Sequence, residues 1–265
     1  MSDPKPKTST QNGRLWGARA RDWAELAERQ TRPAYEAVLG RANVGAGTVY
    51  LDVGCGAGLA AQLAAERGAR VSGLDASEPL LAIARERVPE GDFRLGDLED
   101  LPFEDDRFDV VSGFNSFQFA GNPERALSEA KRVARSGGLV VILTWGPPEG
   151  MEAASVLAAL KPLAPPPSPG APGPFALSDE TALRAFATAA VLEPAEVFDI
   201  ERPWIDPDLD TALRGLNSSG VAARAIESSG EEAVTRAWSE ALAPFRQADG
   251  GYRVEATFRC LFARA

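Results

Sequence analysis

The chain has 265 residues, of which 45% are hydrophobic and 25% charged, and its 28 lysines and arginines against 38 aspartates and glutamates give a net charge of −10. It has no histidine and only two cysteines, Cys55 and Cys260, which excludes Ser-His-Asp and Cys-His catalysis, histidine-ligated metals and a disulfide scaffold. The acidic balance argues against nucleic acid as a partner, because phosphate binding depends on lysine and arginine. We expect a cytoplasmic globular protein without a metal, built as one large domain or one domain with an insertion.

The first residues predict a tail followed by helices. Residues 1–13 are polar and lack the apolar core of a signal peptide, so we expect a disordered tail. From Trp16 onward apolar residues recur at helical spacing, and Pro33 suits the first turn of a second helix. No run of 18 apolar residues occurs, which predicts that no segment spans a membrane.

Between residues 48 and 145, strand-like and helix-like segments alternate. Their composition predicts strands at 48–53, 70–75, 92–96, 108–114 and 139–145. Helical spacing predicts the intervening helices at 59–67, 79–88 and 123–133. Strands and helices that alternate in this way form a parallel sheet with helices on both faces, so the predicted fold class is α/β.

The pattern changes after Trp145. It predicts a helix at 151–160, a stiff proline-rich loop at 162–174, a helix at 178–190 and a strand at 196–200. Three helical segments follow within 206–247, and strict alternation of apolar residues predicts a final strand over 252–264. We therefore expect a core formed by residues 14–204 and 249–265, capped by the N-terminal helices, and a helical insertion at 205–248 that forms a substrate lid.

The strongest local signal is the sequence LDVGCGAG at residues 51–58, where the first strand ends and a helix begins. Glycines there let the backbone turn tightly and let a ligand approach without a Cβ in the way. The following helix N-terminus presents unpaired N–H groups, and open α/β sheets bind ligands outside the carboxyl ends of their strands. Glycine-rich turns also arise from packing alone, so the motif by itself leaves both interpretations open.

A second signal is Asp75, which lies 21 residues after Gly54 at the end of the second predicted strand. A carboxylate at that position is suited to accept hydrogen bonds from the two hydroxyls of a ribose. The alternative is that Asp75 only caps the helix that begins near Pro79. Its place at a strand end, after a glycine turn, favours ribose binding.

Three details distinguish a nicotinamide dinucleotide from another adenosine-containing ligand. The glycine spacing is G-x-G-x-G, not the G-x-G-x-x-G that accommodates a pyrophosphate. Asp52 lies inside the first strand, and an acidic segment, 96–103, follows the third. In this segment Asp97 is suited to accept a hydrogen bond from an adenine amine while the ring packs on Leu98. The alternative for Asp97 is a solvated loop acid.

Taken together, these motifs resemble the class I S-adenosylmethionine-dependent methyltransferases, specifically their type 11 group of small-molecule enzymes. The resemblance rests on residues 51–58, 73–77, 96–103, 108–111 and 136–143, and in order and spacing it covers roughly residues 14–145. It implies S-adenosylmethionine as the cofactor and a Rossmann-like, mostly parallel sheet of seven strands, helices on both faces, with the last strand antiparallel.

The resemblance also implies a set of cofactor-binding residues, namely Trp16, Gly54, Cys55, Gly56, Asp75, Ala76, Asp97, Leu98 and Asn115. The turn residues, 54–56, would line the methionine end of the cofactor, and Asp75 would hold the ribose hydroxyls. Ala76 would lie beside the adenine, whose edge Asp97 and Leu98 would bind.

Two further positions complete this set. Asn115, just after the fourth predicted strand, matches a position that commonly faces the amino group of the cofactor. Trp16 is the candidate for an aromatic residue that closes over the cofactor, and its alternative is a tryptophan that only packs helices together.

The absence of histidine departs from the many family members that place one near the substrate. Any base must then be an Asp, a Glu, a Tyr or a water, and no single residue is identified as catalytic. In-line transfer from a sulfonium neutralises a positive charge that is already present, so holding the reactants in line is worth up to ~7–11 kcal/mol. An acceptor with a low pKa, or a neutral amine, needs little help from a base.

The core of the sheet would bind the cofactor, so we expect specificity for the acceptor to come from the N-terminal helices, the proline-rich loop and the helical insertion at 206–247. The aromatic residues expected either to line an apolar pocket or to pack in the core are Phe114, Phe117, Phe119, Trp145 and Trp204, and Trp238 is expected in the core. The predicted function is methyl transfer to oxygen, nitrogen or carbon of a small molecule, with no nucleic-acid or membrane partner. Alternatives are an NAD-dependent oxidoreductase of Rossmann type and a catalytically silent cofactor-binding protein.

Overall fold

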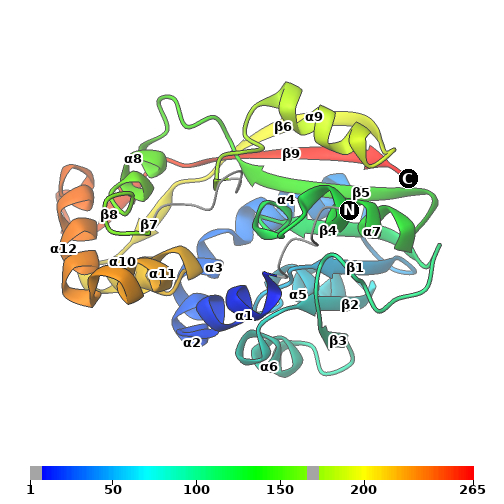
Figure 1. Cartoon of the computed structure of the whole chain (residues 1–265), viewed down its shortest axis with the longest axis horizontal. Helices are drawn as coiled ribbons and strands as arrows, with labels where there is room; N and C mark the ends of the chain where they lie inside the picture. Colours follow the sequence, from blue (N-terminus) through cyan, green and yellow to red (C-terminus); the bar gives the residue numbers. More distant parts are fainter. Residues whose placement is uncertain (1–7, 166–172) are drawn as a thin grey trace, which may run out of the picture.

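A seven-stranded sheet forms the centre of the computed structural model, which describes residues 8–165 and 173–265 (Figure 1). The strand order is β3-β2-β1-β4-β5-β9-β6, and β9 runs antiparallel to both of its neighbours. The strands are β1 (Val49–Val53), β2 (Arg70–Asp75), β3 (Asp92–Leu95), β4 (Phe108–Phe114), β5 (Ala134–Trp145), β6 (Glu193–Glu201) and β9 (Thr257–Arg264). This confirms the predicted Rossmann-like α/β class with an antiparallel last strand.

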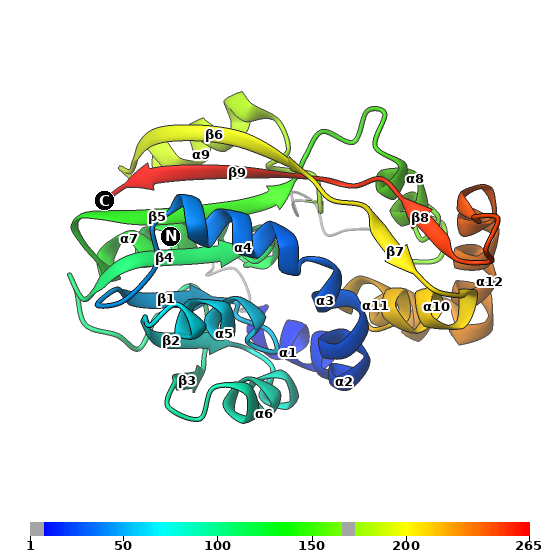
Figure 2. The ribbon, with the colours of Figure 1, turned by 180° about the vertical axis from the view of Figure 1, so that it is seen from behind.

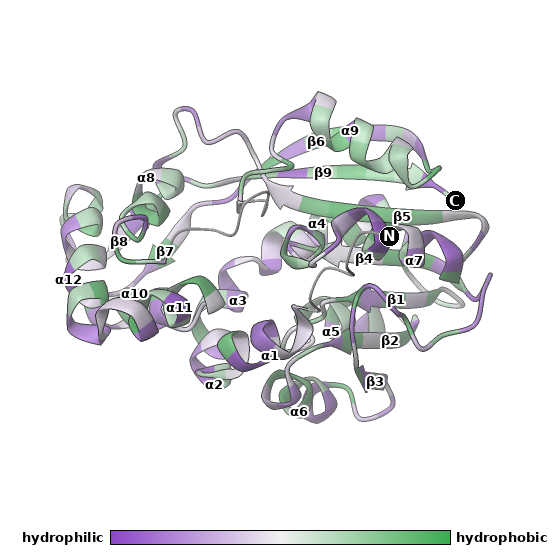
Figure 3. Cartoon of the chain, viewed as in Figure 1, coloured by the Kyte–Doolittle hydropathy of each residue, from purple (hydrophilic) through white to green (hydrophobic). Residues whose placement is uncertain are grey.

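The central strands are apolar on both faces because helices cover both sides of the sheet. On β1, the successive residues Tyr50 and Leu51 are both fully buried, although their side chains point to opposite faces. In Figure 3 the middle of β5 is coloured hydrophobic, whereas α7 (Pro123–Val133) carries hydrophilic and hydrophobic residues side by side. The sheet is therefore the common wall of two hydrophobic cores.

Each core is closed by its own helices. One contains buried residues of α4 (Arg32–Arg41), α5 (Leu59–Glu66) and α6 (Glu78–Arg87). The other contains buried residues of α7 and α9 (Glu180–Ala189). Figure 2 shows α4 and α5 in front of the sheet and α7 and α9 behind it.

The N-terminal helices begin earlier than predicted. The segment comprises α1 (Ser9–Gly17), α2 (Ala20–Asp22), the π-helix η1 (Trp23–Ala27) and α3 (Glu28–Gln30). Residues 9–13 are thus helical rather than a disordered tail, and residues 1–7 lie outside the described part.

Tertiary contacts account for this early start. The amide of Asn12 donates to the carbonyl oxygen of Phe119 at 2.8 Å, and Gly13 packs directly on the backbone of Ala76. Such contacts with distant residues leave no periodic signal in the local sequence.

The insertion before the last strand contains the three predicted helices, which are α10 (Leu209–Asn217), α11 (Gly220–Ser229) and α12 (Glu231–Leu242), followed by the short η3 (Ala243–Phe245). They pack with α8 (Glu152–Ala158) around a separate hydrophobic cluster. Figure 1 shows this group beyond the ends of β4 and β5. Of the proline-rich loop predicted at 162–174, residues 166–172 lie outside the described part.

The period-2 pattern at 252–264 contains two strands rather than one. β8 (Tyr252–Val254) pairs with β7 (Trp204–Asp206) in a small antiparallel sheet, and only β9 enters the main sheet. Alternation continues through the break, so it does not reveal that the two halves have different partners. β7 was not predicted because three residues are too few for a periodic signal.

Within the described residues, no helix combines the length and apolar character needed to cross a membrane.

Candidate functional site

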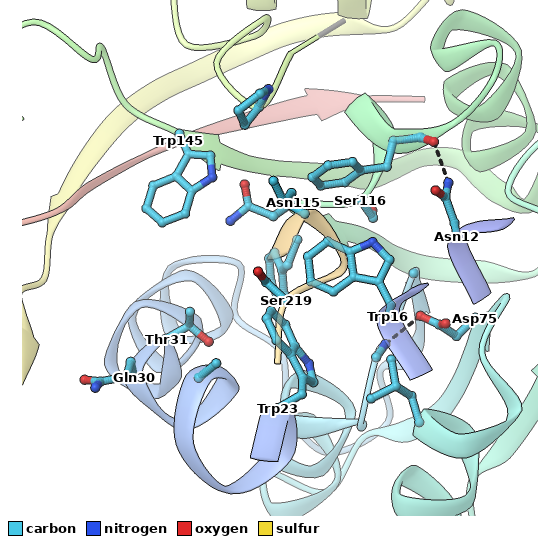
Figure 4. Close-up of a pocket in the computed structure, with 18 of the residues that line it drawn as sticks. Asn12, Trp16, Trp23, Gln30, Thr31, Asp75, Asn115, Ser116, Trp145 and Ser219 are labelled. Carbon is cyan, nitrogen blue, oxygen red and sulfur yellow. Dashed lines mark hydrogen bonds between the residues drawn. The ribbon is translucent and has the colours of Figure 1, made fainter. Parts of the chain in front are cut away.

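A pocket opens at the carboxyl ends of β1, β2, β3 and β4 (Figure 4). The segments after these strands contribute lining residues, and the N-terminal helices and the insertion cover the other sides. Of the predicted cofactor-binding residues, those that line it are Trp16, Gly54, Gly56, Asp75, Ala76, Asp97, Leu98 and Asn115. The structure thus brings together residues up to about a hundred positions apart, and only Cys55 of the predicted set is absent from the wall.

The turn after β1 requires its glycines. Gly54 and Gly56 have φ values of 76° and 54°, in the left-handed region that other residues rarely adopt. A Cβ on Gly54 would lie 2.4 Å from the Cβ of Ser116, far inside van der Waals contact. The backbone of the turn at Gly54 therefore packs directly against the side chain of Ser116, which follows β4, and both residues line the pocket.

The Asp75 carboxylate is held by backbone groups on both sides. Its Oδ2 accepts a hydrogen bond from the N–H of Gly56 at 2.8 Å, and its Oδ1 accepts one from the N–H of Ser77 at 2.8 Å. Burial raises the pKa of Asp75, and these backbone hydrogen bonds oppose the rise. Because each carboxylate oxygen has a second lone pair, the fixed side chain still accepts two further donors.

Asp97 and Ser116 present unsatisfied polar atoms to the pocket. Oδ1 of Asp97 accepts from the N–H of Glu99 at 3.0 Å, but its Oδ2 is buried and has no partner among the described residues. Oγ of Ser116 is likewise buried and has no hydrogen-bond partner among the described residues. Buried polar atoms in folded proteins are nearly always paired, so these two atoms are free to accept a hydrogen bond from a molecule in the pocket.

Asn115 is held in the middle of the pocket by an unusual backbone conformation. Its φ is 51°, its N–H donates to the carbonyl of Leu143 at 2.8 Å, and its Oδ1 accepts from Gln118 at 3.1 Å. Asparagine tolerates this left-handed conformation better than most residues. Figure 4 shows Asn115 between Trp145 and Ser116.

Trp16 lies in the pocket wall and also packs the surrounding helices together. It packs edge-on against Trp23 and Phe119, with ring centroids 4.8 Å and 5.4 Å away. On its other side it contacts Gly220, where a Cβ would lie 2.6 Å from the indole nitrogen. This tryptophan therefore joins α1 to α11 at the pocket wall.

Cys55 lies between the two turn glycines, but its side chain is buried in the core beneath them. A Cβ on Gly73 of β2 would lie 2.9 Å from its sulfur, which places the thiol on the sheet side. Burial raises the pKa of this thiol well above its usual range, so it remains protonated and is a packing group rather than a nucleophile.

Two buried acids beneath the turn complete its surroundings. Asp52 on β1 accepts a hydrogen bond from Ser112 at 2.8 Å, and burial raises its pKa to about 7. Glu28 on α3 forms an ion pair with Arg87 of α6, and burial raises its pKa to about 7 although the arginine opposes the rise. The sequence offered no signal for Glu28, because its partner lies 59 positions away.

The other end of the pocket is apolar and aromatic. Of the aromatic residues proposed for it, Phe114, Phe119, Trp145 and Trp204 line the pocket, whereas Phe117 packs against Phe186 in the core. Trp238 is buried as predicted, yet it also contributes to the wall together with residues of α10 and α11. The insertion thus contributes to the wall of the pocket together with these aromatic residues.

Comparisons with known proteins show what the chain is similar to. Residues 51–142 match the family model described as a methyltransferase domain. Over 127 residues the chain is 33% identical to a malonyl-[acyl-carrier protein] O-methyltransferase of Serratia marcescens, covering 48% of this chain and 50% of the relative. Over 126 residues it is 40% identical to methyltransferase GfsG of Streptomyces halstedii, covering 45% of this chain and 44% of the relative. The chain spans about half the length of the curated relatives it matches.

The fold has counterparts among solved structures. One counterpart belongs to a complex between the Haloferax volcanii Trm112 methyltransferase activator and a methyltransferase. It superposes on this chain with a TM-score of 0.60 at 21% sequence identity, over 98% of each chain. The resemblance inferred from the sequence motifs is therefore confirmed, in that residues 51–142 match a methyltransferase domain and the same part of the chain is similar to methyltransferases.

Proposed function

We propose that the protein transfers the methyl group of S-adenosylmethionine to a small-molecule acceptor, at oxygen, nitrogen or carbon. The observation that carries this proposal is a single pocket with two unlike ends. One end has the glycine turn, Asp75 and Asp97, and the other has an aromatic wall covered by α10, α11 and α12. A cofactor and an acceptor that share this pocket meet near Asn115.

The polar end fits the cofactor. Asp75 would accept hydrogen bonds from the ribose hydroxyls, and the unpaired Oδ2 of Asp97 would accept one from the adenine amine. Ala76 and Leu98 would contact the adenine ring, and Asn115 would face the amino group. The backbone of the turn at 54–56 would line the methionine end, with the Cys55 side chain packed in the core beneath it. Trp16 would cover the cofactor from the side of α1. These assignments form part of the proposal.

In this proposal the chain catalyses the reaction mainly by positioning. S-adenosylmethionine, when bound, supplies an electrophilic methyl group on a sulfonium. The walls around Asn115 hold the acceptor atom in line with that group, and the insertion 205–248, proposed here as a substrate lid, excludes water from the aromatic end. Tyr35 lines the pocket but is a poor base, because burial raises its pKa well above the usual value.

Calorimetric titration with S-adenosylmethionine, S-adenosylhomocysteine and NAD tests the proposal. We expect both sulfur-containing ligands to bind and NAD to bind much more weakly, because the turn lacks pyrophosphate spacing. The absence of binding by the first two ligands at high micromolar concentration would refute the proposal, and preferential binding of NAD would favour an oxidoreductase. Cofactor binding without methyl transfer to any acceptor in a broad chemical panel would indicate a silent protein.

A further inference from the structure

One carboxylate in the pocket has no role in the proposed cofactor site. Asp206, the last residue of β7, lines the pocket and is partly buried. Its Oδ1 accepts a hydrogen bond from the side-chain amide of Gln30 on α3 at 2.9 Å. The same amide group donates to the carbonyl of Ile205 at 3.1 Å and accepts from the Ile205 N–H at 3.0 Å. Gln30 therefore holds the end of β7, and with it the Asp206 carboxylate, in one position.

This carboxylate lies at the acceptor end of the pocket. Figure 4 shows Gln30 and Thr31 on one side and Asp75 on the opposite side, with Asn115 between them. Because Asp206 is hydrogen-bonded to Gln30, it belongs to the same end as Gln30. A ligand anchored at Asp75 and Asp97 leaves Asp206 for a second molecule.

Aromatic rings form the neighbouring wall. Trp145 contacts Trp204 edge-on, with ring centroids 5.8 Å apart, and stacks on Phe258 with centroids 4.9 Å apart. All three residues line the pocket. The faces of such rings attract cations, and their area binds apolar groups.

All the described charged side chains in the pocket wall are acidic. The charged residues that line it are Asp75, Asp97 and Asp206, and within residues 8–165 and 173–265 no lysine or arginine contributes to the wall. An acceptor with a free carboxylate or phosphate would have to bury its charge without a partner, which is strongly unfavourable. A protonated amine would find both a carboxylate and aromatic faces.

On these grounds, and resting on the methyl transfer proposed above, we propose that the acceptor is an amine on an apolar body and that Asp206 is the residue that selects it. Gln30 acts as a positioning residue, because the hydrogen bonds of its side-chain amide go to Asp206 and to the backbone of Ile205. Burial raises the pKa of Asp206 to about 6, so the carboxylate is charged at about pH 8 and available to a cationic amine.

The reaction balances with an amine acceptor. The bound ammonium first loses one proton to water, which leaves a lone pair on nitrogen. This pair forms the new N–C bond while the C–S bond breaks, and sulfur keeps the bonding electrons. The products are S-adenosylhomocysteine and the N-methylated ammonium ion.

Three probes with one carbon skeleton test the inference, namely 2-phenylethylamine, 2-phenylethanol and phenylacetate. Each is titrated at about pH 8 into the full chain saturated with S-adenosylhomocysteine, and binding is followed by ligand-observed NMR. We expect the amine to bind at least about 10-fold more tightly than phenylacetate, with the alcohol between them. Asp206→Asn should reduce the affinity for the amine about 10-fold and change that for the alcohol by less than about 2-fold.

Asp208→Asn is the matched control, because it removes the same charge two residues away. Asp208 is exposed and caps α10, a role that asparagine also fills, so this variant should keep the preference for the amine. Equal or tighter binding of phenylacetate, tighter binding of the alcohol than of the amine, or failure of all three probes to bind would overturn the inference. An unchanged preference in Asp206→Asn would also overturn it. If Asp206→Asn does not fold, the ranking of the probes by the unaltered chain still decides.

Failure of S-adenosylhomocysteine itself to bind is a separate result. It would refute the methyltransferase proposal before any probe is added. The first titration therefore distinguishes an error in the proposed function from an error in the acceptor class.

Discussion

At the scale of single residues, the proposed cofactor end of the pocket depends on atoms whose positions are fixed by the backbone. Asp75 is oriented by two backbone N–H groups, and Gly54 allows Ser116 to approach. Neither residue contributes much apolar burial of its own. A substitution of Asp75 therefore tests binding of the cofactor, whereas a substitution of Gly54 tests the stability of the turn.

Replacing Asp75 by alanine should weaken binding of S-adenosylhomocysteine by about 1.5–3 kcal/mol, the usual range for hydrogen bonds to a charged group. Isothermal titration calorimetry gives this difference directly. Glu104→Ala removes an exposed carboxylate from the loop before β4 and should leave the affinity unchanged. An unaltered affinity in Asp75→Ala would mean that the ribose is held by other groups.

Gly54→Ala should destabilise the fold by two effects, a strained positive φ and a clash with Ser116. Gly47→Ala is the control, because its φ of 86° imposes the same strain but no atom lies within 4 Å of the new Cβ. We expect a loss of about 1–2 kcal/mol for the control and a further 1–3 kcal/mol or so for Gly54→Ala, measured by urea unfolding. Equal losses in the two variants would show that the turn accommodates a side chain at position 54.

At the scale of elements, the site depends on how separate helices meet. α1 and α11 meet where Trp16 packs on Gly220, and an ion pair between Arg14 and Glu227 joins the same two helices. Glu28 of α3 and Arg87 of α6 form a second link, in which Arg87 also donates to the carbonyl of Ala57 at 2.9 Å. The N-terminal helices therefore connect the insertion to the glycine turn.

Gly220→Ala should weaken cofactor binding, because a Cβ there would lie 2.6 Å from the indole nitrogen of Trp16 and must displace the ring. We expect a loss of about 3- to 10-fold in affinity for S-adenosylhomocysteine, at little cost to the helix itself. Gly215→Ala on α10 is the control, since its nearest neighbour is 3.5 Å away. If both variants bind normally, Trp16 does not cover the cofactor.

The alternation of strands and helices was predictable because each element carries its own period. The pattern at 252–264 shows the limit, since it continues unchanged through the break between β8 and β9. Residues 9–13 show a second limit, because contacts with Phe119 and Ala76 order them. Local sequence reports the conformation of a segment but not the partner on which it packs.

At the scale of the whole molecule, buried acids couple stability to pH. Glu28 and Asp52 have ordinary pKa values of 4.5 and 3.8, and burial raises both to about 7 in the folded chain. At pH values between the ordinary and the raised pKa, the folded state binds more protons than the unfolded state does. Their contribution to stability is therefore fully present below the ordinary values and is lost as the pH rises through about 7.

We expect the free energy of unfolding of the ligand-free protein to fall between about pH 5 and pH 8, by at most about 1.4 kcal/mol per pH unit for each acid whose pKa is raised. Asp206, with a pKa of about 6, contributes with the same sign as Glu28 and Asp52. Glu129 and Glu196 have pKa values lowered by their arginine partners, so they change the free energy of unfolding only at more acidic pH. Urea unfolding at several pH values measures the slope. Asp52→Asn should reduce it, whereas a slope of the opposite sign would contradict the assignment of raised pKa values.

The sequence by itself determined the α/β class, the order of the main strands, the glycine turn and the acids at the ends of β2 and β3. These features are local, because each depends on the period of one segment or on a few adjacent residues. Only the tertiary structure decided which side chains share the pocket. The hydrogen bond between Gln30 and Asp206 joins residues 176 positions apart, and Asp97 acquires an unpaired oxygen only when the chain around it is folded. Such relations depend on packing between distant elements, for which the local sequence carries no period or spacing.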